Sequence, residues 1–220
     1  MKIAMKLLAA AGAAAFDGTT TANGIGFYTD YVEWSCASGS LVGDVNLGTN
    51  STGNGVANID DTGWNNCIFF LGMEMTVDQI GTWDLNVQGD NVSGVIAGTI
   101  TNVNARIASV TPGQCEFTVT GQAGGSFNET TQQLTVDDTS PDNDLVVSDV
   151  TGCFGQVLAG DPLHFAATYD ITNSSDGGLV IASSRSESDA GWERAQCAPT
   201  RPANDRSDVV SVHFRTFDTS

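Results

Sequence analysis

The stretch Trp83-Asp84-Leu85-Asn86-Val87-Gln88 decides the fold class of this chain. Its large apolar residues occupy every second position, and polar residues fill the positions between them. A period of two is typical of a β-strand with one buried face and one face in water. Gly89-Asp90-Asn91 follows directly and is the kind of sequence that turns a hairpin. The stretch therefore predicts an antiparallel strand pair.

Similar strand signals recur on both sides of this stretch. Cys67–Val77 is almost continuously apolar and predicts a single buried strand. Cys115–Thr120 and His164–Ile171 alternate, and Thr111-Pro112-Gly113 marks a turn. Long amphipathic helical stretches are missing beyond the N-terminal segment. We expect an all-β fold: a single antiparallel β-sandwich or barrel of about nine or ten short strands, stapled by disulfides.

The N-terminal segment 1–15 has the features of a secretory signal peptide. Lys2 and Lys6 supply a positive start, and Ala13-Ala14-Ala15 offers a small-residue cleavage site after an apolar run. The run is much too short for a membrane-spanning helix, which needs about 20 residues. The segment is also short for a signal peptide, and a truncated start of the sequence would explain its length. We expect a secreted, extracellular protein; the alternative is an N-terminal helix that is retained.

The cysteines fit this compartment. They are Cys36, Cys67, Cys115, Cys153 and Cys197. None forms a C-x-x-C pair, which disfavours a zinc ribbon or a redox site. Exported chains favour structural disulfides, but four cysteines allow three pairings and sequence alone does not choose among them. We favour Cys36–Cys67 and Cys115–Cys153, because each closes a local loop worth about 3–4 kcal/mol in the chain-entropy model. Cys197 is left over.

The formal net charge of −18 is unevenly distributed. Between residues 16 and 182 the sole cation is Arg106, against 20 acidic residues. Such a field repels nucleic acid and anionic membrane surfaces, so we expect no nucleic-acid binding and no membrane insertion. An acidic protein of this kind also suits solubility in a salty or external medium.

The composition changes near residue 183, where we place the end of an all-β domain that spans 16–182. Residues 183–220 hold five of the six arginines and two prolines, and strand alternation fades there. This composition predicts a poorly ordered tail, or an unrelated addition to the coding sequence. Within it, Val209–Phe217 alone is apolar enough for one added strand.

An acidic loop is the best candidate for a ligand site. Asp137, Asp138, Asp142 and Asp144 lie close together in sequence, and calcium takes such oxygen ligands. Their spacing is not that of an EF-hand. We expect either a calcium site or a solvated acidic turn, and the sequence shows no signature of another cofactor.

No catalytic set stands out in the sequence. Nucleophilic catalysis needs a histidine base, and the body has one histidine, His164, on an expected strand, where a structural or surface role is more typical. Glycoside hydrolysis needs two carboxylates across a groove, and acidic residues are too abundant to single out a pair. The candidates are Asp60, Asp61, Glu74 and Asp84.

The tryptophans allow two interpretations. Exposed on one face, they would suit a sugar-binding surface; packed inside, they would belong to the core around the disulfides. We favour the core for Trp34, Trp64 and Trp83.

The two halves of the chain share a weak pattern. Cys36 to Cys67 and Cys115 to Cys153 are each followed by a Gly-bearing apolar segment and then by a strand. An internal duplication and chance similarity both explain it.

Several segments together match a family pattern. The first half contributes Trp64-Asn65-Asn66-Cys67 and Ile96-Ala97-Gly98-Thr99-Ile100; the second contributes Gly152-Cys153-Phe154-Gly155 and Ala167-Thr168-Tyr169-Asp170-Ile171. Over about Thr20–Ile181 the chain resembles small secreted proteins of actinobacteria, a resemblance that implies an exported β domain with four paired cysteines. A fainter resemblance is to secreted activators of alkane oxidation. Neither implies an active site.

These observations favour a secreted, non-enzymatic binding protein or a structural protein of a matrix or surface. It would display loops and an acidic face on a disulfide-locked scaffold. The partners that fit are further copies of the chain, joined through strand edges, and carbohydrate. The alternative is a secreted, carboxylate-dependent hydrolase directed at glycans.

Overall fold

The computed structural model describes residues 12–50, 52–138, 145–173, 177–185 and 208–216. In these residues the chain forms twelve strands and two single-turn 3-10 helices. The strands are β1 (Gly12–Tyr28), β2 (Glu33–Asn50), β3 (Ala57–Phe69), β4 (Met73–Gln79), β5 (Trp83–Val92), β6 (Val95–Ser109), β7 (Cys115–Asn128), β8 (Gln133–Asp137), β9 (Val146–Gly152), β10 (His164–Asn173), β11 (Gly177–Arg185) and β12 (Asp208–Thr216). The 3-10 turns are η1 (Phe70–Gly72) and η2 (Cys153–Gly155).

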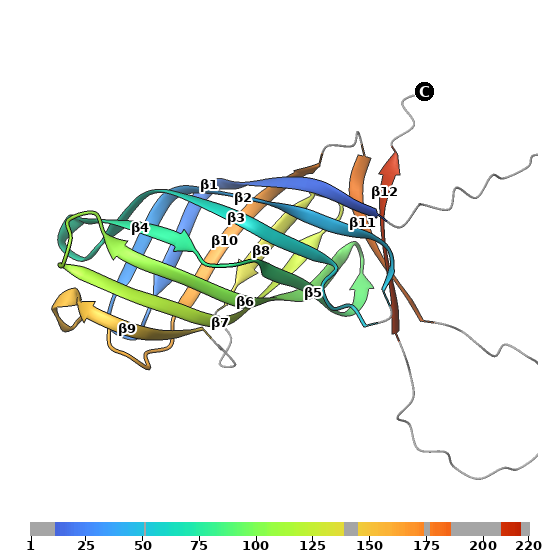
Figure 1. Cartoon of the computed structure of the whole chain (residues 1–220). Helices are drawn as coiled ribbons and strands as arrows, with labels where there is room; N and C mark the ends of the chain where they lie inside the picture. Colours follow the sequence, from blue (N-terminus) through green and yellow to red (C-terminus); the bar gives the residue numbers. More distant parts are fainter. Residues whose placement is uncertain (1–11, 51, 139–144, 174–176, 186–207, 217–220) are drawn as a thin grey trace, which may run out of the picture.

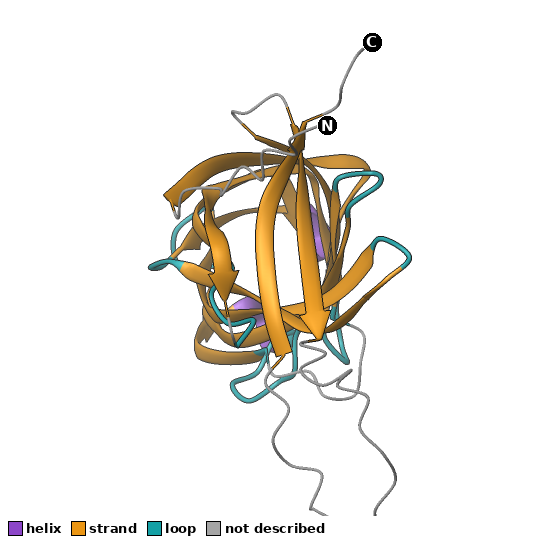
Figure 2. Ribbon diagram, turned by 90° about the vertical axis from the view of Figure 1, so that its right-hand side faces the viewer, coloured by secondary structure: helices purple, strands orange, loops and turns teal. Residues whose placement is uncertain are grey.

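The sheet closes on itself, with every pairing antiparallel (Figures 1 and 2). From β1 the pairings run through β2, β3, β4, β6, β7, β8 and β10, and β10 pairs again with β1. Strand β5, like β4, pairs with both β3 and β6, farther along the two strands. Strand β9 pairs with β7, next to the part of β7 that pairs with β8. The closed sheet thus has an interior and two ends.

The all-β class is confirmed, but the expected nine or ten short strands were wrong in number and length. Strands β1, β2 and β6 contain 17, 18 and 15 residues. Turn-forming residues lie inside these strands, where they interrupt the regular pairing. Gly24, with a φ of 72°, lies in the register shift between Thr19 and Ile25 of β1. A β-bulge lets a strand continue where the sequence suggests that it stops.

The hairpin after Trp83–Gln88 exists, but its turn lies further along than expected. Gly89-Asp90-Asn91 falls in a register shift of the β5–β6 ladder, and the chain reverses at Ser93 and Gly94. Both turn residues have positive φ values, 55° and 83°, as a two-residue hairpin turn of type I′ requires.

Aromatic side chains fill the interior near one end of the sheet. Phe27 stacks on Trp34 with ring centroids 5.3 Å apart and also contacts Phe165 at 5.1 Å. Trp34 in turn meets Phe69 and Phe117 edge-on, and Phe117 is fully buried. These contacts give a packed, rigid support beneath the loops at that end.

The described strands cross the domain boundaries expected from the sequence. Gly12–Ala15, expected within the signal segment, open β1 and pair with Asp44–Leu47 of β2. At the other boundary, β11 extends to Arg185, beyond residue 182. Within the expected tail, β12 matches the one added strand foreseen there, and it pairs with β11 and β2. Cys197 lies outside the described residues.

Strands β11 and β12 form a hairpin that crosses one end of the closed sheet (Figures 1 and 2). We call this end the hairpin end. The apolar residues that it buries are Leu179, Val180, Ile181, Val210 and Val212.

Candidate functional site

Four described loops meet at the opposite end of the sheet: 29–32, 70–72, 110–114 and 153–163. The end of β1 lies opposite the starts of β2 and β10, and the end of β3 lies opposite the start of β4. The end of β6 and the end of β9 both adjoin the start of β7. We call these four loops and the two disulfides behind them the stapled end (left in Figure 1).

Both expected disulfides are present, and both lie at this end. Cys36 and Cys67 face each other across the β2–β3 ladder and are bonded. Cys115 lies opposite Gly152 in the β7–β9 ladder and is bonded to Cys153, the next residue. Each bond therefore ties neighbouring strands where they enter the loops.

A 3-10 turn lies close to each disulfide: η1 begins at Phe70, shortly after Cys67, and η2 begins at Cys153 itself. The middle residue is left-handed in both turns: Leu71 has φ 56° and ψ 25°, and Phe154 has φ 53° and ψ 25°. A glycine with positive φ follows each of them, Gly72 and Gly155. The two turns thus share a left-handed apolar residue followed by a glycine.

The two turns hold large apolar side chains out in water. Leu71 is 89% exposed and Phe154 is 65% exposed. A left-handed backbone is uncommon for such residues and carries a local conformational cost. The rest of the stapled end adds Tyr31, Val110 and Leu158, each more than half exposed.

A groove of about 460 Å³ lies between η1, η2 and loop 110–114. Its lining combines apolar side chains with a few polar ones: Phe70, Leu71, Gly72, Met73, Glu74, Val110, Thr111, Gln114 and Phe154. This volume is within the range of pockets that take small molecules or individual side chains of a partner.

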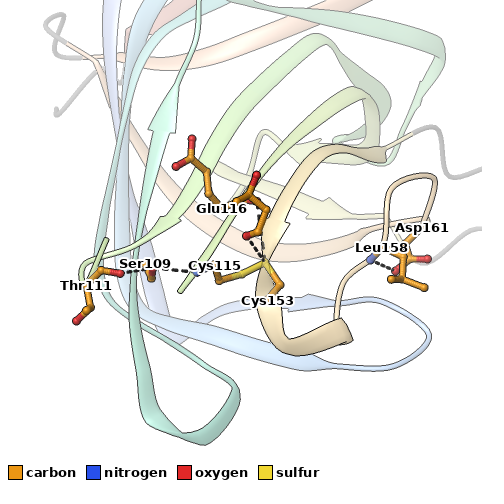
Figure 3. Close-up of a disulfide and its surroundings, with 8 residues drawn as sticks. Ser109, Thr111, Cys115, Glu116, Cys153, Leu158 and Asp161 are labelled. Atoms are coloured by element: carbon orange, nitrogen blue, oxygen red, sulfur yellow. Dashed lines mark hydrogen bonds between the residues drawn. A yellow bond between two sulfur atoms is a disulfide. The ribbon is translucent and has the colours of Figure 1, made fainter. Parts of the chain in front are cut away.

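Hydrogen bonds hold loop 110–114 and the second disulfide in place (Figure 3). The Ser109 hydroxyl donates to the Thr111 carbonyl at 2.6 Å and accepts from the Cys115 amide at 3.1 Å. The Cys153 amide donates to the Gln114 carbonyl at 2.8 Å. The groove is therefore built on fixed backbone, which limits the ordering cost of binding.

Loop 153–163 is fixed in the same way. The Asp161 carboxylate accepts from the Leu158 amide at 2.8 Å (Figure 3), and the Leu163 amide donates to the Leu145 carbonyl at 3.0 Å. Leu158 is thereby presented at the tip of a braced loop.

The charged side chains in the loops of this end are all acidic. Loops 29–32, 70–72, 110–114 and 153–163 contain Asp30 and Asp161 but no lysine, arginine or histidine. Glu74 adds a carboxylate to the groove wall. Arg106 is engaged on the outer face of β6, 2.8 Å from Glu116 and 3.5 Å from Asp78, and its hydrogen bond lowers the pKa of Glu116.

The structure describes part of the expected calcium loop. Asp137 is exposed at the end of β8, and Asp138 is buried, with its carboxylate accepting from the Gly124 amide at 3.5 Å. Asp142 and Asp144 lie outside the described residues. Within the described part of the chain, no three His, Cys, Asp or Glu side chains converge as metal ligands. The calcium site stays a prediction.

His164 lies beside this loop, at the start of β10. Its ring stacks on Tyr28 with centroids 4.5 Å apart, and its Nδ1 lies 3.0 Å from the Asp138 carbonyl oxygen. Burial, with the charges of Asp137 and Asp138, raises the pKa of Tyr28 above its usual 10.0. These contacts give His164 a structural position between two strands.

The four carboxylates considered for hydrolysis do not share one site. Glu74 lies at the stapled end, opposite Ile68 of β3. Asp60 lies eight residues away along that strand, about 26 Å at the usual rise per residue, too far for a catalytic pair with Glu74. Asp61 follows Asp60, and Asp84 pairs opposite Asn58 in the same distant region.

The tryptophans belong to the core, as expected. Trp34 and Trp83 are buried, and Trp64 packs against Phe27 and Phe165. None of the three offers an exposed sugar platform.

Leu71 shows what sequence reasoning missed. The apolar run Cys67–Val77 predicted one buried strand, which was wrong: β3 ends at Phe69, η1 intervenes, and β4 starts at Met73. The available signal was a glycine after an apolar residue close behind a cysteine, in Leu71-Gly72 and again in Phe154-Gly155.

Comparison with known proteins finds no matching family model, curated protein or solved structure. The resemblances to secreted actinobacterial proteins and to activators of alkane oxidation therefore stay predictions. Among the described residues, no helix is long and apolar enough to cross a bilayer.

Proposed function

We propose that this chain is a secreted, non-enzymatic binding protein and that the stapled end is its binding surface. One observation carries the proposal. Two 3-10 turns, each close to a disulfide and each with a left-handed middle residue, expose Leu71 and Phe154 beside a groove of about 460 Å³.

Physical cost supports this interpretation. Each exposed apolar side chain of this size forgoes about 1.5–3 kcal/mol that burial would give. Backbone strain at the same residues adds to that cost, and such strain gathers at functional sites. Exposed apolar groups that cluster, rather than scatter, mark interaction surfaces.

The scaffold supports it as well. The two disulfides suit an oxidising, extracellular compartment. Binding residues on loops that a rigid scaffold positions are a common arrangement.

The test compares retention of labelled protein on cells of the producing organism. The variant is Leu71→Ser with Phe154→Ser, and the matched control is Val92→Ser, an apolar residue 68% exposed near the β5–β6 turn, away from the stapled end. We expect retention of the double variant to fall about tenfold, a change of about 1.4 kcal/mol, with the control unchanged. Equal retention of all three proteins would reject the stapled end as the binding surface.

A further inference from the structure

Resting on the proposed function, we infer that the groove takes a polypeptide segment in which large apolar side chains are flanked by lysine or arginine. The inference combines the shape and apolar lining of the groove with the charge around it.

The groove supplies apolar contact from three sides. Leu71 belongs to η1, Phe154 to η2 and Val110 to loop 110–114, and Phe70 and Met73 complete the apolar lining. Methionine adapts to side chains of different shape, so Leu, Phe, Ile or Met of a partner would fit this surface.

Polar groups at the same groove suit a peptide backbone. Thr111 and Gln114 line it beside the apolar residues, and both are exposed. A hydroxyl donates and accepts hydrogen bonds, as a side-chain amide does, so these two residues can satisfy the N–H and C=O groups of an extended segment.

The charge around the groove selects the flanking residues. Glu74 lies in its wall, and Asp30 and Glu33 are exposed at the neighbouring β1–β2 connection. The four loops supply no cation to offset them. Arg106, the cation in the surrounding strands, is already paired with Glu116 and Asp78. A cationic partner gains from this field, because complementary potentials speed encounter and exclude wrong partners.

The same field disfavours the other apolar occupants. A second copy of this chain would bring another formal charge of −18 to the interface. An anionic bilayer is repelled for the same reason. A zwitterionic bilayer remains as the competing occupant that experiment must separate.

The probe is a short fluorescent peptide in which lysine alternates with leucine and phenylalanine, measured by anisotropy against the intact protein. We expect saturable binding that weakens about tenfold in Leu71→Ser/Phe154→Ser and about threefold in Asp30→Asn/Glu74→Gln. Val92→Ser and Asp17→Asn, which change exposed residues away from the groove, should bind as the unaltered protein does. Near-ultraviolet circular dichroism and the masses of both disulfide-linked peptides verify the fold of each variant.

Two further peptides and one vesicle complete the experiment. A glutamate version of the peptide and a version with serine at the apolar positions should both fail to bind. Equal binding of the glutamate version, or undiminished binding by Leu71→Ser/Phe154→Ser, would overturn the inference. Phosphatidylcholine vesicles that bind through Leu71 and Phe154 while the lysine peptide does not would also overturn it, yet leave the stapled end as the binding surface. If the double variant loses cell retention but the unaltered protein binds no peptide, the stapled end stands as the binding surface and the peptide inference fails.

Discussion

The two ends of the closed sheet present apolar side chains in opposite ways. At the hairpin end, β11 and β12 cross the opening and bury Leu179, Ile181 and Val212 against the interior. At the stapled end, Leu71 and Phe154 stand in water beside a groove. The chain therefore covers an apolar opening at one end and leaves apolar side chains exposed at the other, a contrast that supports our proposal that the stapled end is a binding surface.

The means of fixation differ too. Covalent bonds between strands hold the stapled end. At the hairpin end, side chains bond the outer edge of β11: the Leu179 amide donates to Gln132 Oε1 at 2.7 Å and the Ile181 amide to Glu129 Oε1 at 2.6 Å. Asn91 Nδ2 donates to the Ile181 carbonyl at 3.2 Å. Side chains here satisfy groups that a neighbouring strand would satisfy within a sheet.

Removal of the hairpin should have the largest effect on stability. Ending the chain after Asn173 removes five buried apolar side chains and exposes the residues that they pack against. Burial of each such side chain contributes about 1.5–3 kcal/mol to the free energy of unfolding. The sum, roughly 10 kcal/mol, approaches the whole stability of a typical domain, about 5–15 kcal/mol. We expect loss of the cooperative thermal transition and binding of a dye for exposed apolar surface. A truncated chain with an unchanged midpoint would show that the hairpin is an accessory.

Removal of one disulfide should cost less. Cys115→Ala with Cys153→Ala opens a loop with a sequence separation of 38, and the expected loss is about 3–4 kcal/mol. Denaturant unfolding measures it, with Cys36→Ala/Cys67→Ala as the matched pair. An unchanged midpoint would show that the ladders alone fix the stapled end.

Loss of a single side-chain bridge at the hairpin end comes next. Gln132 accepts from the Leu179 amide, and its Nε2 donates to the Leu179 carbonyl at 3.0 Å. Gln132→Ala removes both bonds and a third, from Nε2 to the Glu129 carbonyl at 2.6 Å, and we expect a loss of about 1–3 kcal/mol in urea unfolding. Gln133→Ala, which removes an exposed bond to Asp170, is the control and should change little. Equal midpoints for the two variants would contradict a structural role for Gln132.

The sequence predicted the class of the fold and its disulfides because both depend on local signals. Period-two alternation gave strands such as Trp83–Gln88, and the spacing of the cysteines favoured loops that the structure closes. Closure of the sheet depends on a contact between distant segments, such as Tyr28 opposite His164, that no local pattern encodes.

The sequence did not predict the groove, for a different reason. Hydrophobicity placed Leu71 inside, because burial is the usual fate of an apolar residue within an apolar run. A left-handed backbone at Leu71, followed by Gly72 with positive φ, turns the side chain out into water instead.

Alkaline pH should test the interior between the two ends. Tyr169 of β10 is buried, and burial raises the pKa of its hydroxyl well above the usual 10.0. Folding thus favours the protonated phenol: its contribution to stability is fully present below pH 10 and is lost as the pH rises from there toward the folded-state pKa. We expect unfolding midpoints to fall above pH 10, and to fall less in Tyr169→Phe. Parallel curves for the two proteins would contradict a protected phenol.

The smallest effect on stability should come from the residues with the largest effect on binding. Leu71 and Phe154 contribute little buried surface, since they are 89% and 65% exposed. Leu71→Ser and Phe154→Ser should each change the free energy of unfolding by less than about 0.5 kcal/mol, as exposed substitutions usually do. Thermal unfolding of the two variants beside Ile181→Ser, a buried residue of the hairpin end, makes the comparison. A loss at Leu71 as large as that at Ile181 would mean that η1 is needed for folding, and its exposed side chain would no longer indicate a binding surface.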